Sequence, residues 1–113
     1  MEQPLKVRAS LRIVREDKLF GPGVAQLMEG VEQLGSLRRS AARMEMSYNK
    51  AWSVVHGCEE ALGFALLERH IGGAVLTERG KTLLARYRAF SNKAHELLDQ
   101  MAEEYFSDIL KER

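Results

Sequence analysis

Hydrophobic positions follow two different periods in the first third of the chain. Within residues 6–13 an apolar side chain falls at every second position, which predicts a strand with one buried face. Within residues 24–34 the apolar side chains recur every three or four positions, which predicts an amphipathic helix. Pro22 suits the first turn of that helix because the amide it lacks would have no partner there. Gly35 is expected to end the helix.

Two further helices are predicted next, joined by a tight turn. Ser36 can cap a short helix over residues 37–44, and Ser47 can cap a third helix from residue 48 to about residue 62. The inward positions of the third helix are apolar, whereas its outward positions carry no large aliphatic side chain. We expect Trp52 to pack in the core, because it is large and flanked by core positions.

A glycine-rich hairpin and a long helix complete the pattern. Residues 66–71 and 74–77 read as two short strands around Gly72 and Gly73. Thr77 can cap a helix that runs from residue 78 to about residue 110. This helix would span roughly 50 Å, with residues 91–93 as the expected place for a break. Its apolar positions step by four and three residues, like the seam of a coiled coil.

The order strand, helix, short helix, turn, helix, hairpin, long helix predicts a mainly α fold with a small β wing. This fold is a winged helix-turn-helix with an N-terminal strand and a long C-terminal dimerisation helix. We expect residues 1–76 to form the DNA-binding domain and residues 77–113 to form the dimerisation segment of the same compact unit, with no separate ligand domain. The seam could instead pack on its own globule, but the length of the helix favours a homodimer. The expected dimer contacts are Leu83, Tyr87, Phe90, Ala94, Leu97, Met101 and Tyr105.

Composition supports a soluble protein with an uneven distribution of charge. The hydrophobic share of 45% and charged share of 29% are ordinary for a globular domain. Residues 36–56 hold four basic side chains against one acidic side chain, whereas residues 96–113 hold two against six. A basic middle and an acidic end are expected when one surface meets a polyanion. The single cysteine, and the lack of a long apolar run or a signal peptide, point to the cytoplasm and away from a membrane.

The third helix has the features of a recognition helix that enters the major groove of double-stranded DNA. Asn49 could pair with adenine and Lys50 could donate to guanine, while arginines and helix caps contact phosphates. The expected DNA contacts are Ser36, Arg38, Arg39, Arg43, Ser47, Tyr48, Asn49, Lys50, Ser53, His56, Arg69, His70, Gly72 and Gly73.

Several of these side chains have a second interpretation. Tyr48 could touch a phosphate or only brace Trp52, and His56 could reach DNA or simply be solvated. His70 is expected near a phosphate or in solvent, and Cys58 is expected to be a buried core thiol.

Other classes of function find little support. There is no phosphate-binding loop, no dinucleotide fingerprint and no nucleophile with a plausible base, so we expect no enzyme and no cofactor. The histidines and the cysteine lack the number and spacing of a zinc site. The alternative to DNA binding is a winged-helix module that binds a partner protein, and a second regulatory chain could work with either form.

The chain resembles the N-terminal domain of the ModE family of molybdate-responsive transcriptional regulators and, more loosely, LysR-type regulators. The resemblance covers about residues 5–110 and rests on three segments, namely 35–42 (GSLRRSAA), 46–52 (MSYNKAW) and 67–80, which includes GGAVLT. It implies a winged helix-turn-helix that dimerises through its flanking helices and binds operator DNA. The molybdate-binding region of that family lies beyond the region of resemblance, so molybdate sensing is not carried over.

Overall fold

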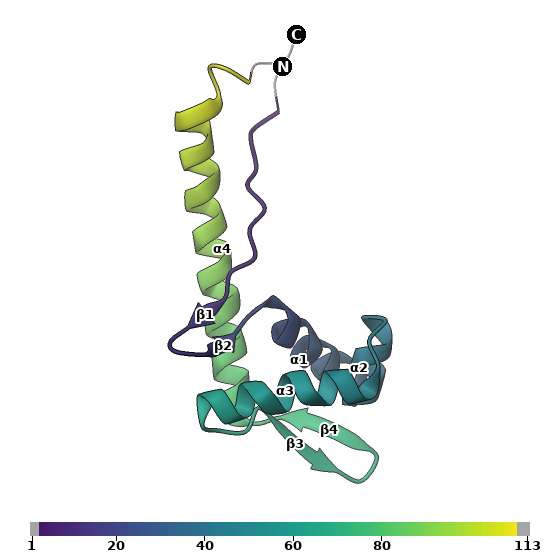
Figure 1. Cartoon of the computed structure of the whole chain (residues 1–113). Coiled ribbons are helices and arrows are strands. Elements are labelled where there is room, and N and C mark those ends of the chain that lie inside the picture. The colour runs from purple at the N-terminus through teal and green to yellow at the C-terminus, as the bar shows by residue number, and fades with distance from the viewer. Residues whose placement is uncertain (1–2, 111–113) are drawn as a thin grey trace.

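A long helix rises from a body of three shorter helices and two small hairpins (Figure 1). The computed structural model describes residues 3–110. Its elements are β1 (Ile13–Val14), β2 (Lys18–Phe20), α1 (Pro22–Leu34), α2 (Leu37–Arg43), α3 (Tyr48–Leu62), β3 (Leu67–His70), β4 (Gly73–Leu76) and α4 (Glu78–Phe106). The helix-turn-helix of α2 and α3, followed by the β3–β4 wing, confirms the predicted fold class. Among the helices of residues 3–110, none has the length and hydrophobicity of a membrane-spanning segment.

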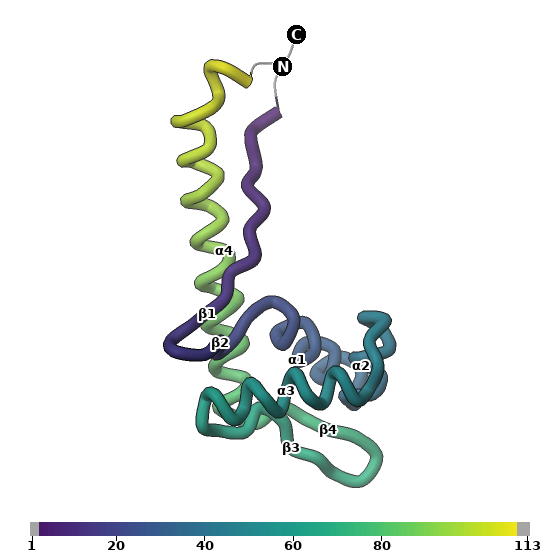
Figure 2. The backbone as a smooth tube through the Cα atoms, viewed as in Figure 1, coloured from purple at the N-terminus to yellow at the C-terminus, as the bar shows by residue number. Residues whose placement is uncertain are grey.

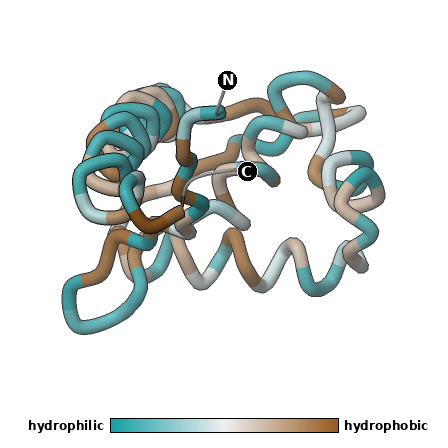
Figure 3. Tube along the Cα trace, turned by 90° about the horizontal axis from the view of Figure 1, so that it is seen from above, coloured by the Kyte–Doolittle hydropathy of each residue, from teal (hydrophilic) through white to brown (hydrophobic). Residues whose placement is uncertain are grey.

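The body is built as the helical periodicity predicts. Pro22 begins α1, and Gly35 ends it in the left-handed conformation with φ 78°, a backbone geometry that glycine adopts without strain. The apolar stripe of α1 is buried against α2, α3 and the wing. All the helices carry both hydrophobic and hydrophilic residues along their length, as amphipathic helices do (Figure 3).

A buried polar contact lets α1 and α2 approach closely. The Ser40 hydroxyl donates to the carbonyl oxygen of Leu27 at 2.7 Å, and its side chain is fully buried. A Cβ atom on Gly30 would lie 1.9 Å from that hydroxyl oxygen, so only glycine fits there. The α1–α2 packing is therefore fixed by one hydrogen bond and one missing side chain.

The prediction of an N-terminal strand over residues 6–13 is wrong. Only Ile13–Val14 pairs, with β2, and the residues before it run extended beside α4 without a neighbouring strand (Figure 2). The backbone amide of Leu5 donates to Glu103 Oε1 at 2.6 Å, and that of Val7 donates to Asp99 Oδ1 at 2.7 Å. Helix carboxylates thus satisfy donors that a strand ladder would otherwise satisfy.

The break predicted at residues 91–93 is also wrong, because α4 runs unbroken through all three. None of these residues is proline or glycine, so nothing there removes an amide donor or clashes with the preceding turn. The helix starts at a Thr77 cap, as predicted, but ends at Phe106, four residues short of the expected end. Its first turns pack on the body, where the ring of Tyr87 meets Phe20 edge-on at 5.1 Å.

Candidate nucleic-acid interface

The first turn of α3 presents polar side chains on a fixed backbone. The Ser47 hydroxyl accepts a hydrogen bond from the amide of Lys50 at 3.1 Å, which is the predicted N-cap. Asn49, Lys50, Ser53 and His56 are all exposed on the outward side of the helix. These four side chains are therefore available to a molecule that approaches α3.

The turn between α2 and α3 holds the two helices at a set angle. Glu45 has φ 55°, the left-handed conformation that is uncommon for a residue other than glycine. The amide of Met46 donates to Ala41 O at 2.9 Å, and that of Glu45 donates to Ala42 O at 3.0 Å. Met44 and Met46 pack against the core, so the turn is anchored from both sides.

Two arginines converge on one aromatic ring in the cleft between α2, α3 and the wing. The guanidinium of Arg38 lies 4.3 Å from the centre of the Tyr48 ring, and that of Arg69 lies 5.9 Å from it. The cleft has a volume of about 360 Å³ and is also lined by Ser36, His70 and Gly72. Within residues 3–110 neither guanidinium forms an ion pair with a carboxylate. The cleft therefore holds two positive charges that no acidic side chain in the described part of the chain neutralises.

The wing is attached directly to the start of the helix-turn-helix. The amide of Ala74 donates to Gly35 O at 2.9 Å, and a Cβ atom on Gly73 would lie 2.0 Å from the same oxygen. Gly73 is the first residue of β4 rather than part of the turn, which leaves Gly72, with φ 91°, as the glycine that turns the chain. The two glycines thus have different tasks, one in close packing and one in chain reversal.

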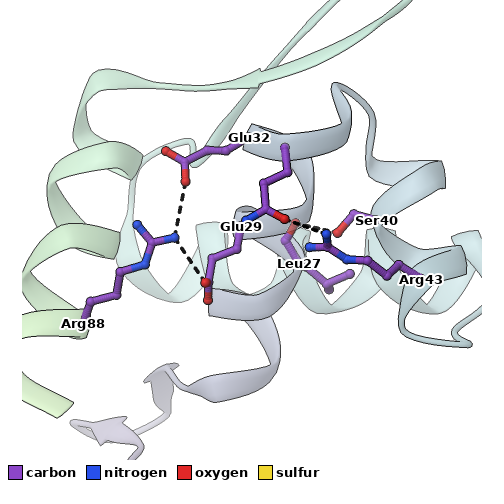
Figure 4. Close-up of polar contacts among 7 residues, drawn as sticks. Leu27, Glu29, Glu32, Ser40, Arg43 and Arg88 are labelled. Carbon is purple, nitrogen blue, oxygen red and sulfur yellow. Dashed lines mark hydrogen bonds and ion pairs between the residues drawn. The ribbon is translucent and has the colours of Figure 1, made fainter. Parts of the chain in front are cut away.

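Of the other basic candidates, Arg39 and Arg43 lie outside this cleft, whereas His70 contributes to its lining. Arg43 Nη1 donates to Gln33 Oε1 at 2.6 Å, so its side chain turns toward α1 (Figure 4). Arg39 is exposed on α2, and its backbone amide donates a hydrogen bond to the capping hydroxyl of Ser36. His70 Nδ1 lies 3.0 Å from Ile71 O in the wing. The structure therefore brings Arg38, Arg69 and Tyr48 together and leaves Arg43 outside the group.

The prediction that Trp52 is a core residue is wrong. The core at this height is filled by Ala51 and Val55, whereas Trp52 is 42% exposed and stacks on the His56 ring with centroids 4.5 Å apart. The helical period could have revealed this, because Trp52 follows outward-facing Asn49 by three residues and precedes His56 by four. The sequence gives no comparable signal for the contact between Arg69 and Tyr48, because this contact depends on how the wing packs against α3.

His56 itself is held by acidic neighbours. Its Nε2 lies 3.0 Å from Glu60 Oε1, one helical turn further on, and its Nδ1 lies 3.9 Å from Glu59 Oε1. Glu59 has a second task, because its Oε2 accepts hydrogen bonds from the amides of Leu66 and Leu67. The C-terminal half of α3 thus carries negative charge. Arg38 and Arg69 lie instead near Tyr48, at the N-terminal end of the helix.

Cys58 is a buried thiol, as predicted, and lies on the side of α3 that faces the body. Its Sγ donates to Leu19 O at 2.6 Å. Burial raises the pKa of the Cys58 thiol to about 11, with a further increase from the neighbouring Glu59 carboxylate. In the part of the chain that the structure describes, no three histidine, cysteine or acidic side chains gather to hold a metal ion.

The body has three helices, of which α2 and α3 are joined by a tight turn, and a two-stranded wing follows them. This arrangement defines a winged helix-turn-helix domain. Residues 25–81, which are just over half of the chain, match the family of bacterial regulatory helix-turn-helix proteins of the LysR type. The chain belongs to this family. The match begins in α1 and ends in the first turn of α4, so it covers the helix pair and the wing.

Relatives and solved structures agree with this assignment. The chain is 30% identical over 83 residues to the molybdenum transport protein ModE of Azotobacter vinelandii, covering 69% of this chain and 31% of that protein. It is 29% identical over 97 residues to the transcriptional regulator ModE of Haemophilus influenzae, covering 85% and 37% of the two. The crystal structure of the CbnR_DBD–DNA complex superposes with a TM-score of 0.61 at 25% identity, covering 72% of this chain and 93% of that one. The resemblance to ModE and LysR-type regulators is confirmed, and the chain spans about a third of the length of these ModE relatives.

Proposed function

We propose that this chain is a cytoplasmic, DNA-binding transcriptional regulator that binds an operator as a homodimer. The observation that carries the proposal is the pair of guanidiniums over Tyr48, which no carboxylate within residues 3–110 neutralises. Phosphate is the anion that suits such a pair, because a planar guanidinium can bind it through two parallel hydrogen bonds. Most of the affinity of such proteins comes from phosphate contacts of this kind.

The neighbouring first turn of α3 supplies the sequence reading. Asn49 and Lys50 extend from a capped helix end, and recognition helices contact base edges mainly from this end. The amide of Asn49 would pair with adenine, and the ammonium of Lys50 would donate to guanine. Arg38 and Arg69, whose guanidiniums both lie near the Tyr48 ring, would hold the phosphates that set the register of α3 in the groove.

The distal half of α4 supplies the proposed contact with a second copy. Phe90, Leu97, Met101 and Tyr105 are all exposed there, although they are large and apolar. Leu83 and Tyr87, at the base of the same seam, already pack on the chain's own body. The dimer contact is therefore assigned to the part of the seam beyond Tyr87, and Ala94 at its centre allows close approach.

Two-fold symmetry has a consequence for the DNA. A homodimer presents two copies of α3 related by a two-fold axis, so its operator should be palindromic. The half-sites should lie about 34 Å apart or at a multiple of that spacing.

Fluorescence anisotropy tests the proposal most simply. A labelled duplex selected from a randomised pool, and a scrambled duplex of the same composition, would be titrated with the protein at several salt concentrations. We expect preference for the selected duplex and a steep loss of affinity with salt, because neutralised phosphates release counterions. Failure to bind either duplex at low salt would contradict the proposal and favour the alternative, a winged-helix module for a protein partner.

A further inference from the structure

The outward side of α3 carries one large apolar side chain among small and polar ones. Trp52, the only tryptophan in the chain, is 42% exposed although the body beneath it is well packed. An isolated exposed apolar residue is common on protein surfaces and alone has no meaning. The place of Trp52 matters here, because it lies one helical turn from Asn49 on the side that faces the proposed DNA.

The indole ring is held in place by its neighbours. The His56 ring stacks against it at an interplanar angle of 18°, and the close contact between His56 and Glu60 fixes the histidine in turn. A hollow of about 60 Å³ beside the ring is lined by Leu37, Leu67 and Arg69 among others. The ring therefore borders a hollow that wing residues also line, and its stacking on His56 reduces the side-chain freedom that would be lost on binding.

Only one kind of group in the major groove is suited to contact an apolar side chain at the position of Trp52. The base edges present donors and acceptors, apart from the C5-methyl group of thymine, which apolar side chains contact. Asn49 and Lys50 carry polar groups and are suited to adenine and guanine. None of the other outward side chains of α3 is apolar and large enough to cover a methyl group.

We propose that Trp52, held by His56, is a specificity-determining residue that packs its indole edge against a thymine methyl group in each operator half-site. This inference rests on the proposed DNA binding and adds a third reading position to Asn49 and Lys50. The site recognises an apolar methyl group, so it distinguishes thymine from uracil, which has the same hydrogen-bonding edge without the methyl.

Base substitution without any change to the protein gives the sharpest test. Each thymine of the selected duplex would be replaced by uracil in turn, and binding would be measured by anisotropy. For the wild-type chain we expect one replacement in each half-site to weaken binding roughly fourfold, the value of one buried methyl group. The same replacement should leave the affinity of Trp52→Ala unchanged, because the partner of the methyl group is already missing.

The tryptophan also reports on itself. On the selected duplex we expect acrylamide to quench the Trp52 fluorescence less than it does in the free protein, since the ring becomes covered. Trp52→Phe should keep part of the preference for thymine over uracil, because it keeps an aromatic ring. Circular dichroism would check that this variant folds. Val14→Ala, which trims an exposed apolar residue away from α3, is the matched control and should behave as wild type.

The outcomes separate this inference from the proposed function. Selection that enriches no duplex would overturn both. Two results on an enriched duplex would overturn only the assignment of Trp52. In the first, every uracil replacement leaves the affinity of the wild type unchanged. In the second, a uracil replacement weakens the binding of Trp52→Ala as much as it weakens that of the wild type. Unchanged acrylamide quenching in the bound state would overturn it as well, even if Trp52→Ala failed to fold.

Discussion

The body and the distal half of α4 expose opposite kinds of surface. Around Tyr48 the body collects guanidiniums that no carboxylate neutralises within residues 3–110, whereas distal α4 combines exposed apolar side chains with carboxylates. Two of those carboxylates, Asp99 and Glu103, accept hydrogen bonds from backbone amides of the N-terminal segment. The difference shows how a small chain can direct one end to a polyanion and the other to an apolar partner, and substitutions at each end should change one property only.

The largest effect should come from the basic end. Replacing Arg38 and Arg69 together by alanine should weaken DNA binding on the order of a hundredfold for each half-site, because each arginine loses a charge-assisted contact. Oligomeric state should not change. Anisotropy titrations would measure the loss, with the Arg8→Ala, Arg15→Ala double variant as the charge-matched control, since both arginines are exposed and lie outside the cleft. Equal losses from the two double variants would contradict a localised phosphate site.

The apolar end should respond to Leu97→Glu. If Leu97 is buried between two copies, its loss from both should raise the dimer dissociation constant by about a hundredfold, since burying each leucine is worth about 1.5 kcal/mol or more. Sedimentation velocity would measure the change. Glu104→Gln, which alters charge on an exposed position of the same helix without touching the apolar seam, serves as the control. A wild-type chain that sediments as a monomer at all concentrations would contradict the dimer.

A smaller effect is expected where the wing meets the body. In Gly73→Val the new side chain would overlap Gly35 O, so the wing must move away from the helix-turn-helix. We expect a loss of about 1–3 kcal/mol in the free energy of unfolding, measured by urea denaturation. Gly57→Val is the comparison, because nothing lies within 4 Å of an added Cβ there. Equal losses at the two sites would contradict the close approach of Gly73 to Gly35 O as the cause.

The smallest effect concerns the joint between the two regions. Arg88 Nη2 on α4 lies 3.2 Å from Glu29 Oε2 and 3.4 Å from Glu32 Oε1 on α1 (Figure 4). All three side chains are partly exposed, so Arg88→Ala should cost only about 0.2–1 kcal/mol in unfolding free energy. Thermal unfolding at low and high salt would measure it, and a loss that does not shrink with salt would point to packing rather than charge.

The sequence predicted those parts of the molecule that depend on local periodicity. The apolar stripe of α1, the caps Ser47 and Thr77 and the glycine at position 35 all lie where the spacing of residues placed them. Such features need only the chain's own helical geometry. The helix-turn-helix and its wing follow from their order along the chain.

The errors arose where tertiary contacts decide the outcome. Residues 6–13 have the alternation of a strand, but only Ile13 pairs with another strand, and the amide of Val7 donates to the Asp99 carboxylate on α4 instead. Trp52 was assigned by its size rather than by its helical phase. The convergence of Arg38 and Arg69 on Tyr48 depends on how the wing packs, and no local pattern encodes that.

If the Tyr48 cleft neutralises DNA phosphates, its two arginines must contribute to the salt dependence of binding. The logarithm of the binding constant would be measured against the logarithm of the salt concentration for the wild type and for the Arg38→Ala, Arg69→Ala double variant on the same selected duplex. We expect a shallower slope for the variant, by about 0.9 for each phosphate contact removed. Identical slopes would contradict it, because the two guanidiniums would then have displaced no counterions from the DNA.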